Sequence, residues 1–161
     1  MSKNDVLQGA TTGFVMLTAY RNAVAEVIGP EQALDLHVKI CDALGSAFGQ
    51  KAKKDMMLED VDAATARDIA AEVLGSMLGV SGEVVSQSPT KLVTKWGKCP
   101  VHEAHVQMGM TSEQMETTCR ASSMKFMDSF IKQLNPKLRW ESVRHRAGGE
   151  ESCYDACIME P

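Results

Sequence analysis

The spacing of apolar residues changes along this chain, and that change limits the fold more than any other feature. In the first half, apolar side chains recur at helical spacing, as in Leu17, Tyr20, Val24, Val27 and Ile28. In the second half, short segments alternate with a period of two, which is typical of half-buried strands. This order predicts an α+β fold, in which N-terminal helices pack on a roughly four-stranded antiparallel sheet.

The helical half, residues 1–79, is expected to form three helices. Gly29-Pro30 ends the first helix and begins the second, because proline suits the first turn of a helix. Asp62 stands where it can cap the third helix, and Gly79 is placed to end that helix. The second helix is expected to pack on the first through an apolar face made of Ala33, Leu36, Ile40, Leu44 and Phe48.

The cysteine-rich half, residues 80–161, is expected to hold the sheet and a further long helix between two hairpins. Thr111 and Gln114 form a capping box for that helix. Turn residues join the strands, with Ser88-Pro89 in the first hairpin and Gly148-Gly149 in the second. The expected strands span residues 82–85, 90–96, 138–143 and 153–159. Because no repeat or linker divides the chain, residues 1–161 are expected to form a single domain.

Charge and composition exclude several classes of function. The chain has 17 Lys and Arg against 21 Asp and Glu, a net charge of −4, and no block of basic residues. A nucleic-acid partner is therefore not expected. No apolar run approaches the length of a membrane span, and the first residues carry no signal-peptide pattern. We therefore expect a cytoplasmic protein that has no membrane partner.

Sulfur is the unusual part of the composition, with eleven methionines and five cysteines. An odd number of cysteines does not suit the complete disulfide framework of a secreted protein, so free thiols are expected. A free thiol is most often a small buried apolar group. A role in metal binding or nucleophilic chemistry must therefore be argued from the position of each cysteine.

The segment from Cys99 to His105 holds the first candidates. Pro100 is expected to begin a helix, so Cys99 would lie where unpaired amides and the helix dipole favour a thiolate. His102 and His105 would share one face of this helix. The run His-Glu-Ala-His is one residue too short for the HExxH zinc motif. The alternative is an ordinary first helical turn with solvated imidazoles.

Three further cysteines lie downstream. Cys119 is on the apolar stripe of the long helix, where an inert core thiol is the alternative to a ligand. Cys153 and Cys157 share a strand, in which their Cα atoms would be roughly 13 Å apart. Only one of them can therefore complete a mononuclear site with Cys99 and Cys119, whereas an iron–sulfur cluster tolerates the separation better.

A set of motifs extends over nearly the whole chain. It comprises Tyr20, Ile28-Gly29-Pro30-Glu31-Gln32-Ala33, Trp96-x-x-Cys99-Pro100, Gly109, Cys119, Asn135-Pro136, Gly148-Gly149 and Cys153. With these motifs the chain resembles the L-2-amino-thiazoline-4-carboxylic acid hydrolase family. The resemblance implies an enzyme that opens a small heterocycle by hydrolysing a carbon–nitrogen bond. It also implies that Cys99, Cys119 and Cys153 are the cysteines that correspond to the motif of the family. Cys157 is an additional cofactor-binding candidate. The expected layout also looks like the 4-vinyl reductase type of small-molecule-binding domain, which implies a homodimer.

Two mechanisms suit these residues. Cys99, Cys119 and Cys153 can hold zinc or an iron–sulfur cluster, with the cluster slightly favoured, while His102 or Glu103 moves protons. Alternatively, Cys99 acts directly as a nucleophile with a neighbouring imidazole as its base. The metal hypothesis is preferred because a single nucleophile gives Cys119 and Cys153 no chemical role. A non-catalytic binding or sensor module that contains a metal or cluster is the alternative to an enzyme.

Overall fold

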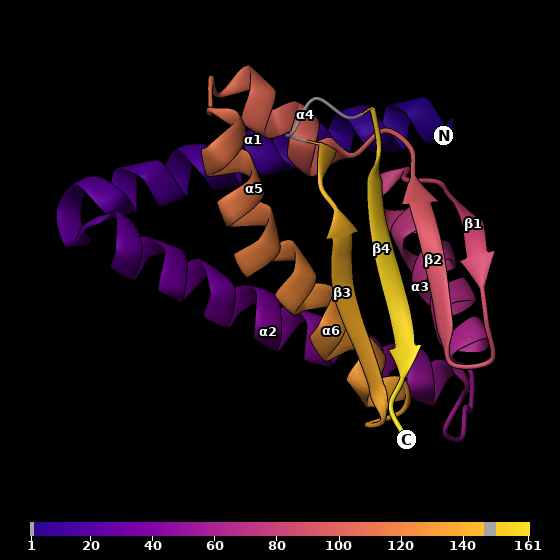
Figure 1. Ribbon diagram of the computed structural model, residues 1–161. Helices are drawn as coiled ribbons and strands as arrows, with labels where there is room; N and C mark the ends of the chain where they lie inside the picture. The colour runs from indigo at the N-terminus through magenta and orange to yellow at the C-terminus, as the bar shows by residue number, and fades with distance from the viewer. Residues whose placement is uncertain (1, 147–150) are drawn as a thin grey trace.

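The computed structural model describes residues 2–146 and 151–161, and it confirms the α+β fold class. The helices are α1 (Lys3–Ile28), α2 (Pro30–Asp55), α3 (Ala63–Leu78), α4 (Pro100–Gln107), α5 (Ser112–Ala121) and α6 (Ser123–Leu134). The strands are β1 (Gly82–Gln87), β2 (Lys91–Trp96), β3 (Leu138–Arg144) and β4 (Cys153–Met159). They form one antiparallel sheet in the order β1-β2-β4-β3, with the helices on one of its faces (Figure 1). The predicted Gly148-Gly149 turn lies outside the described residues.

The inward face of the sheet is set by strict alternation in the two central strands. In β2, Leu92, Thr94 and Trp96 are buried while the residues between them are partly exposed. Trp96 is the register partner of Cys153, and Thr94 is the partner of Asp155. Side chains with odd numbers in β4 therefore face the helices, because successive residues of a strand point to opposite faces.

Local capping signals work as the sequence predicts. The Asp62 carboxylate caps α3 by accepting a hydrogen bond of 2.8 Å from the backbone N–H of Thr65. Thr111 and Gln114 form the expected capping box at the start of α5. Gly79 ends α3 in the left-handed conformation, with φ of 69°, which glycine adopts without strain. These signals act over three or four residues, so the sequence alone is enough to define them.

The long helix expected before Pro136 consists of two helices, α5 and α6, that meet at Ser122. The Ser122 hydroxyl donates a hydrogen bond of 2.7 Å to the carbonyl of Thr118. Such a bond to the preceding turn competes with the regular helical ladder and bends the helix. The break separates the α5 segment that carries Cys119 from the α6 segment that packs in the core.

The packing of α2 differs from the prediction. Leu36, Ile40 and Leu44 are each about half exposed, so the prediction that they form a packed face is wrong. The buried residues of α2 are instead small ones, among them Gly45 and Gly49. A Cβ on Gly45 would overlap the backbone carbonyl of Phe126. The glycines therefore allow α2 to approach the α6 backbone closely, and this contact turns the larger apolar residues outward.

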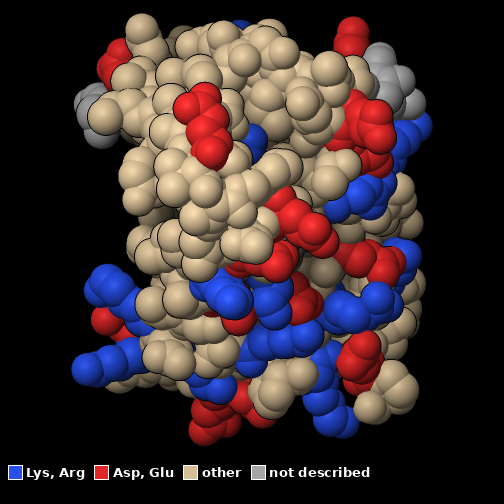
Figure 2. Space-filling model, turned by 90° about the vertical axis from the view of Figure 1, so that its left-hand side faces the viewer, with Lys and Arg blue, Asp and Glu red and all other residues tan. Residues whose placement is uncertain are grey.

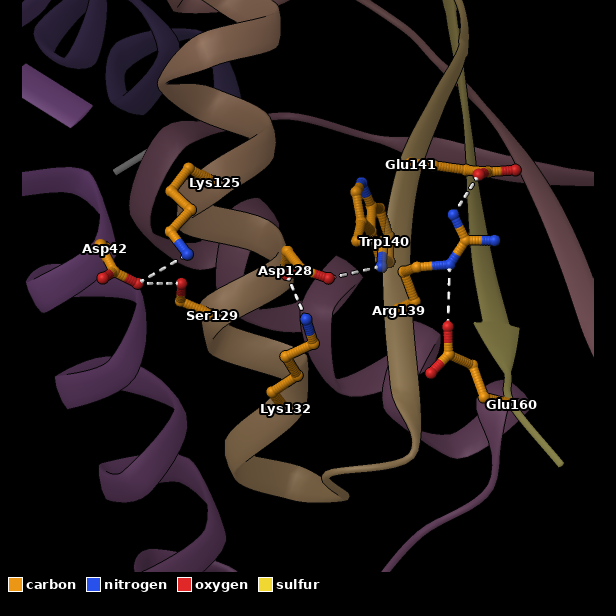
Figure 3. A network of polar contacts seen from close by, with 9 residues as sticks. All are labelled: Asp42, Lys125, Asp128, Ser129, Lys132, Arg139, Trp140, Glu141 and Glu160. Atoms are coloured by element: carbon orange, nitrogen blue, oxygen red, sulfur yellow. Dashed lines mark hydrogen bonds and ion pairs between the residues drawn. The ribbon is translucent and has the colours of Figure 1, made fainter. Parts of the chain in front are cut away.

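Polar contacts hold α6 between α2 and β3, as Figure 3 shows. On one side, Asp42 of α2 accepts a hydrogen bond from Ser129 and pairs with Lys125 at 3.3 Å. On the other side, Asp128 accepts a hydrogen bond of 3.0 Å from the backbone N–H of Trp140. Asp128 thereby fixes the position along β3 from which the Trp140 side chain extends into the molecule.

The hydrophobic core lies between the sheet, α3 and α6. It combines residues from both halves of the chain, including Ile69, Trp96, Phe130, Leu138 and Cys157. Within the described residues, no helix combines the length and the apolar character needed to cross a bilayer. All five cysteines lie in the described ranges, and each is a free thiol.

Candidate functional site

Three of the cysteines singled out by sequence come close together at one end of the sheet. Cys99 is the N-cap of α4, Cys119 lies on α5 and Cys153 is the first residue of β4. All three are partly exposed. Burial raises the pKa of Cys119, and the neighbouring Cys99 and Cys153 raise it further. Electrostatic coupling of this kind requires proximity, so the fold gathers thiols from three separate elements.

The helix start does not make Cys99 a thiolate, contrary to expectation. Burial raises the pKa of Cys99 above that of an ordinary thiol. The backbone amides of His102 and Val101 and the charge of Arg146 act in the opposite direction but are weaker. Desolvation disfavours the charged form of a thiol, and here it outweighs the helix terminus. Cys99 is therefore a neutral thiol in this state of the protein.

Arg146 is the cation of the site. The residue is buried, and its Nε donates to the Cys153 sulfur at 3.3 Å. Its Nη2 donates to the carbonyls of Trp96, at 3.1 Å, and Gly97. A guanidinium held in this way ties the end of β2 to the start of β4 and keeps a permanent positive charge beside the thiols.

The thiols as they lie do not form a coordination shell. In the described part of the chain, no group of three or more His, Cys, Asp or Glu side chains is arranged to hold a metal ion. Cys157 lies deeper, fully buried in the hydrophobic core as the register partner of Leu92 and Trp140. Burial raises the pKa of Cys157 to about 12. The residue stands in an environment typical of an inert thiol.

The two proton-transfer candidates of α4 are adjacent to this cluster. Burial and the charge of Arg146 lower the pKa of His102, while the Glu103 carboxylate acts in the opposite direction. His102 is therefore neutral near pH 7. Within the described residues its Nδ1 is buried and has no hydrogen-bond partner. His105 is more deeply buried, and burial followed by the charge of Arg21 lowers its pKa to about 4.

Asp155 is the residue of the site that sequence reasoning missed. It is buried on the inward face of β4, and burial raises its pKa to about 7. The nearby indoles of Trp140 and Trp96 and two arginines oppose this rise without cancelling it. A signal was present in the sequence, because Asp155 is the one charged residue in Cys-Tyr-Asp-Ala-Cys-Ile-Met and shares its strand parity with Cys153 and Cys157.

Together these groups form a polar cluster at the edge of an apolar core. It contains neutral thiols, a neutral imidazole, a carboxyl that ionises near neutral pH and a fixed guanidinium. Groups whose ionisation is shifted by burial can exchange protons with a bound molecule near pH 7. The arrangement is chemically suited to binding a small polar molecule and to acid–base chemistry upon it.

The fold is that of a small α+β domain, and it is similar to solved structures of other proteins. One similar structure is a trafficking protein particle complex subunit 3 from Naegleria fowleri, covalently bound to palmitic acid, with a TM-score of 0.61 at 11% identity. That match covers 93% of this chain and 96% of the other. Another is the phenol-responsive sensory domain of the transcription activator PoxR with phenol, with a TM-score of 0.61 at 15% identity, covering 91% and 74%. At these identities the likeness shows the fold alone.

The sequence comparison identifies the family. Residues 11–154 match the L-2-amino-thiazoline-4-carboxylic acid hydrolase family, so the chain belongs to that family and the predicted resemblance is confirmed. No curated protein matches the sequence. The family supports a hydrolase-like function for the domain.

Proposed function

We propose that this protein is a hydrolase that opens a small heterocycle at a carbon–nitrogen bond. The observation that carries the proposal is the convergence of Cys99, Cys119 and Cys153 with Arg146 and His102 at one end of the sheet. Membership of a family of ring-opening hydrolases supports the same reaction class. The substrate would enter at the partly exposed thiols and contact the sheet below them.

The residues have separable roles in this proposal. His102 is neutral, so it accepts a proton from the attacking water or from a thiol and returns it to the leaving nitrogen. Glu103 raises the pKa of His102 and so adjusts its strength as a base. Arg146 supplies positive charge that attracts an acidic substrate. The thiol of Cys99 is the nucleophile in the variant of the mechanism that passes through a covalent intermediate.

His102→Gln tests the hydrolase directly. The assay follows consumption of 2-amino-thiazoline-4-carboxylate by mass spectrometry, with a product heavier by one water. Loss of general-base catalysis is expected to lower kcat by about 10²- to 10⁴-fold. The control is His37→Gln, which changes a histidine of α2. Equal activity of both variants would remove His102 from the mechanism, and an inactive wild-type protein would refute the hydrolase.

A thiolate-bound metal is the second candidate, because three thiols from three elements lie close enough to affect one another. Zinc or an iron–sulfur cluster on Cys99, Cys119 and Cys153 would require the thiols to lose their protons and move into a coordination shell. Metal analysis and a visible spectrum of protein purified without oxygen test this candidate. Brown protein indicates a cluster, colourless protein with stoichiometric zinc indicates zinc, and metal-free active protein rejects both.

A non-catalytic binding module is the alternative to an enzyme. Its support is the fold, since the two similar structures are described with palmitic acid and with phenol. A module binds the small molecule without turnover, whereas a hydrolase releases a hydrated product. The mass-spectrometric assay described above therefore also decides between these two functions.

The proposal also includes the oligomeric state of the protein and its location in the cell. We propose that the protein is a homodimer that forms through the outward faces of α1 and α2. Exposed apolar side chains on these helices are Met16, Tyr20, Val27, Leu36, Ile40 and Leu44. Figure 2 shows the side of the molecule where α1 meets α2, and charged residues gather in its lower half while the upper half is mostly neutral. A cytoplasmic location suits five free thiols, and cell fractionation tests it.

A further inference from the structure

Four buried side-chain atoms lack a hydrogen-bond partner among the described residues, and all four lie in or beside the candidate site. They are the indole nitrogens of Trp96 and Trp140, Oδ1 of Asp155 and Nδ1 of His102. Buried polar groups in folded proteins are nearly always paired, because an unpaired one forfeits its bonds to water. A concentration of unpaired groups in one place calls for a bound partner.

Three of the four share the inward face of the sheet. Trp96, Trp140 and Asp155 come from the adjacent strands β2, β3 and β4, and they are only 5%, 4% and 6% exposed. The two indole rings are 6.2 Å apart between centroids. The indole N–H groups of Trp96 and Trp140 are directed at the Asp155 carboxyl and lower its pKa, but neither reaches Oδ1 with the geometry of a full hydrogen bond. Two hydrogen-bond donors and one acceptor therefore lie close together without completing hydrogen bonds to one another.

The polar groups beside this trio have hydrogen-bond partners of their own. Thr94, the register partner of Asp155, accepts a hydrogen bond of 3.1 Å from the buried Arg67. The carbonyl of Trp96 accepts from Arg146, and the backbone N–H of Trp140 donates to Asp128. These bonds fix β2 and β3 behind the unpaired atoms. Such a support is typical of a preorganised binding site.

We propose that Trp96, Trp140 and Asp155 form a binding subsite for an N–H–C=X group, where X is oxygen or nitrogen, on a small ring. The acceptor X takes hydrogen bonds from the indoles, and the adjacent ring N–H donates to Oδ1 of Asp155. Cyclic amides, ureas and amidines have this pattern. The assignment rests on the proposed function in one respect, since it takes the ligand to be the substrate and the C=X group to be the one that is hydrolysed.

The sequence provides a specific reporter for this subsite. Trp96 and Trp140 are the only two tryptophans of the chain, so its amide NMR spectrum contains two indole N–H signals. The probe is 2-imidazolidinone, a cyclic urea with one acceptor oxygen and two N–H donors. Its matched partner is 1,3-dimethyl-2-imidazolidinone, which keeps the oxygen and lacks the donors. The urea is expected to shift both indole signals saturably and to bind at least tenfold more tightly than the dimethyl compound.

Variants separate the subsite from general effects. Asp155→Leu removes the acceptor and leaves both indole reporters, so the urea should lose at least tenfold in affinity while the dimethyl compound changes little. Tyr154→Phe is the control, because Tyr154 is the next residue of β4 and points to the opposite face. It should bind both probes as the wild-type protein does. If Asp155→Leu does not fold, the comparison of the two probes on the wild-type protein still decides the question.

The outcomes distinguish the subsite from the proposed function. The subsite is overturned if the urea leaves the indole signals unmoved, which is the result expected when only a resident water occupies the place. It is also overturned if the two probes bind equally. Binding as expected without hydrolysis of any ring overturns the proposed function and leaves the subsite standing. Hydrolysis at the wild-type rate by Asp155→Leu also overturns the assignment of the subsite to the substrate.

Discussion

At the scale of single residues, burial decides the chemistry of this protein. Sequence position suggests a thiolate at Cys99, yet desolvation holds it as a thiol. The same cause brings the pKa of Asp155 close to neutrality and lowers the pKa of His105. The surroundings of each group set its pKa, because the charged form is disfavoured where water is excluded. The functional groups of the site are therefore mostly neutral near pH 7.

The first prediction concerns His105 and acid stability. Its pKa is about 4 in the folded protein and about 6.5 in the unfolded chain, so between these values only the unfolded chain binds the proton. Stability from this residue is full above pH 6.5 and is lost as the pH falls towards 4. His105→Gln should therefore lose less unfolding free energy between pH 7 and pH 4.5 than the wild-type protein. Urea unfolding at several pH values measures this.

The wild-type protein and the variant also provide an internal control. Between pH 7 and pH 8 the imidazole is neutral in both states, so the stability difference between the two proteins should be constant there. A difference that stays constant down to pH 4.5 would contradict the assignment of acid sensitivity to His105.

At the scale of secondary-structure elements, the contact between α2 and α6 organises the helical layer. Gly45 and Gly49 bring the two backbones together, and Phe48 packs on Phe126 beside them with ring centroids 6.1 Å apart. On its other side, α6 holds the backbone of β3 through Asp128. The close approach of α2 therefore affects the placement of Trp140 in the site.

The second prediction is that Gly45→Ala destabilises the protein. Alanine is a better helix former than glycine, but here its methyl group would overlap the carbonyl of Phe126, so α2 must shift. We expect a loss of about 1–3 kcal/mol, the usual range for overpacking. Thermal or urea unfolding measures the change.

Gly13→Ala in α1 is the matched control. Gly13 is exposed and a Cβ there would meet nothing within 4 Å. The substitution should stabilise the protein by about 0.5–1 kcal/mol through helix propensity alone. The same sign of effect for Gly45→Ala and Gly13→Ala would show that the α2–α6 contact is looser than the structure has it.

At the scale of the whole molecule, α1 and α2 leave apolar surface uncovered. They diverge from the turn at Gly29-Pro30, and their outward sides carry side chains such as Val27, which is 83% exposed (Figure 1). Isolated exposed apolar residues are ordinary, but a set of them along two neighbouring helices is typical of an interface. The proposed homodimer would cover this surface.

The third prediction concerns the mass in solution. Light scattering after size-exclusion chromatography should give twice the chain mass for the wild-type protein. Ile40→Glu places a charge within the apolar face of α2 and should reduce the measured mass to that of one chain. Met57→Glu is the control, because Met57 is 90% exposed and follows the end of α2. A single-chain mass for the wild-type protein would refute the dimer.

Much of the fold could be predicted because its signals are local. The Asp62 cap, the Thr111–Gln114 box and the ends of β2 and β4 each depend on residues a few positions apart. The site was predicted in part: the sequence singled out Cys99, Cys119 and Cys153 and overlooked Asp155. Arg146 joins the site only through tertiary packing, which buries its side chain.

By itself, the sequence determined where most helices and strands lie, which residues alternate on each strand and where thiols are available. Only the tertiary structure decided which of the apolar faces are covered, which charges are desolvated and which polar groups meet. The physical reason is the separation along the chain over which each effect acts. Backbone conformation responds to neighbours along the chain, whereas burial and electrostatic contact depend on segments that are distant in sequence and adjacent only after folding.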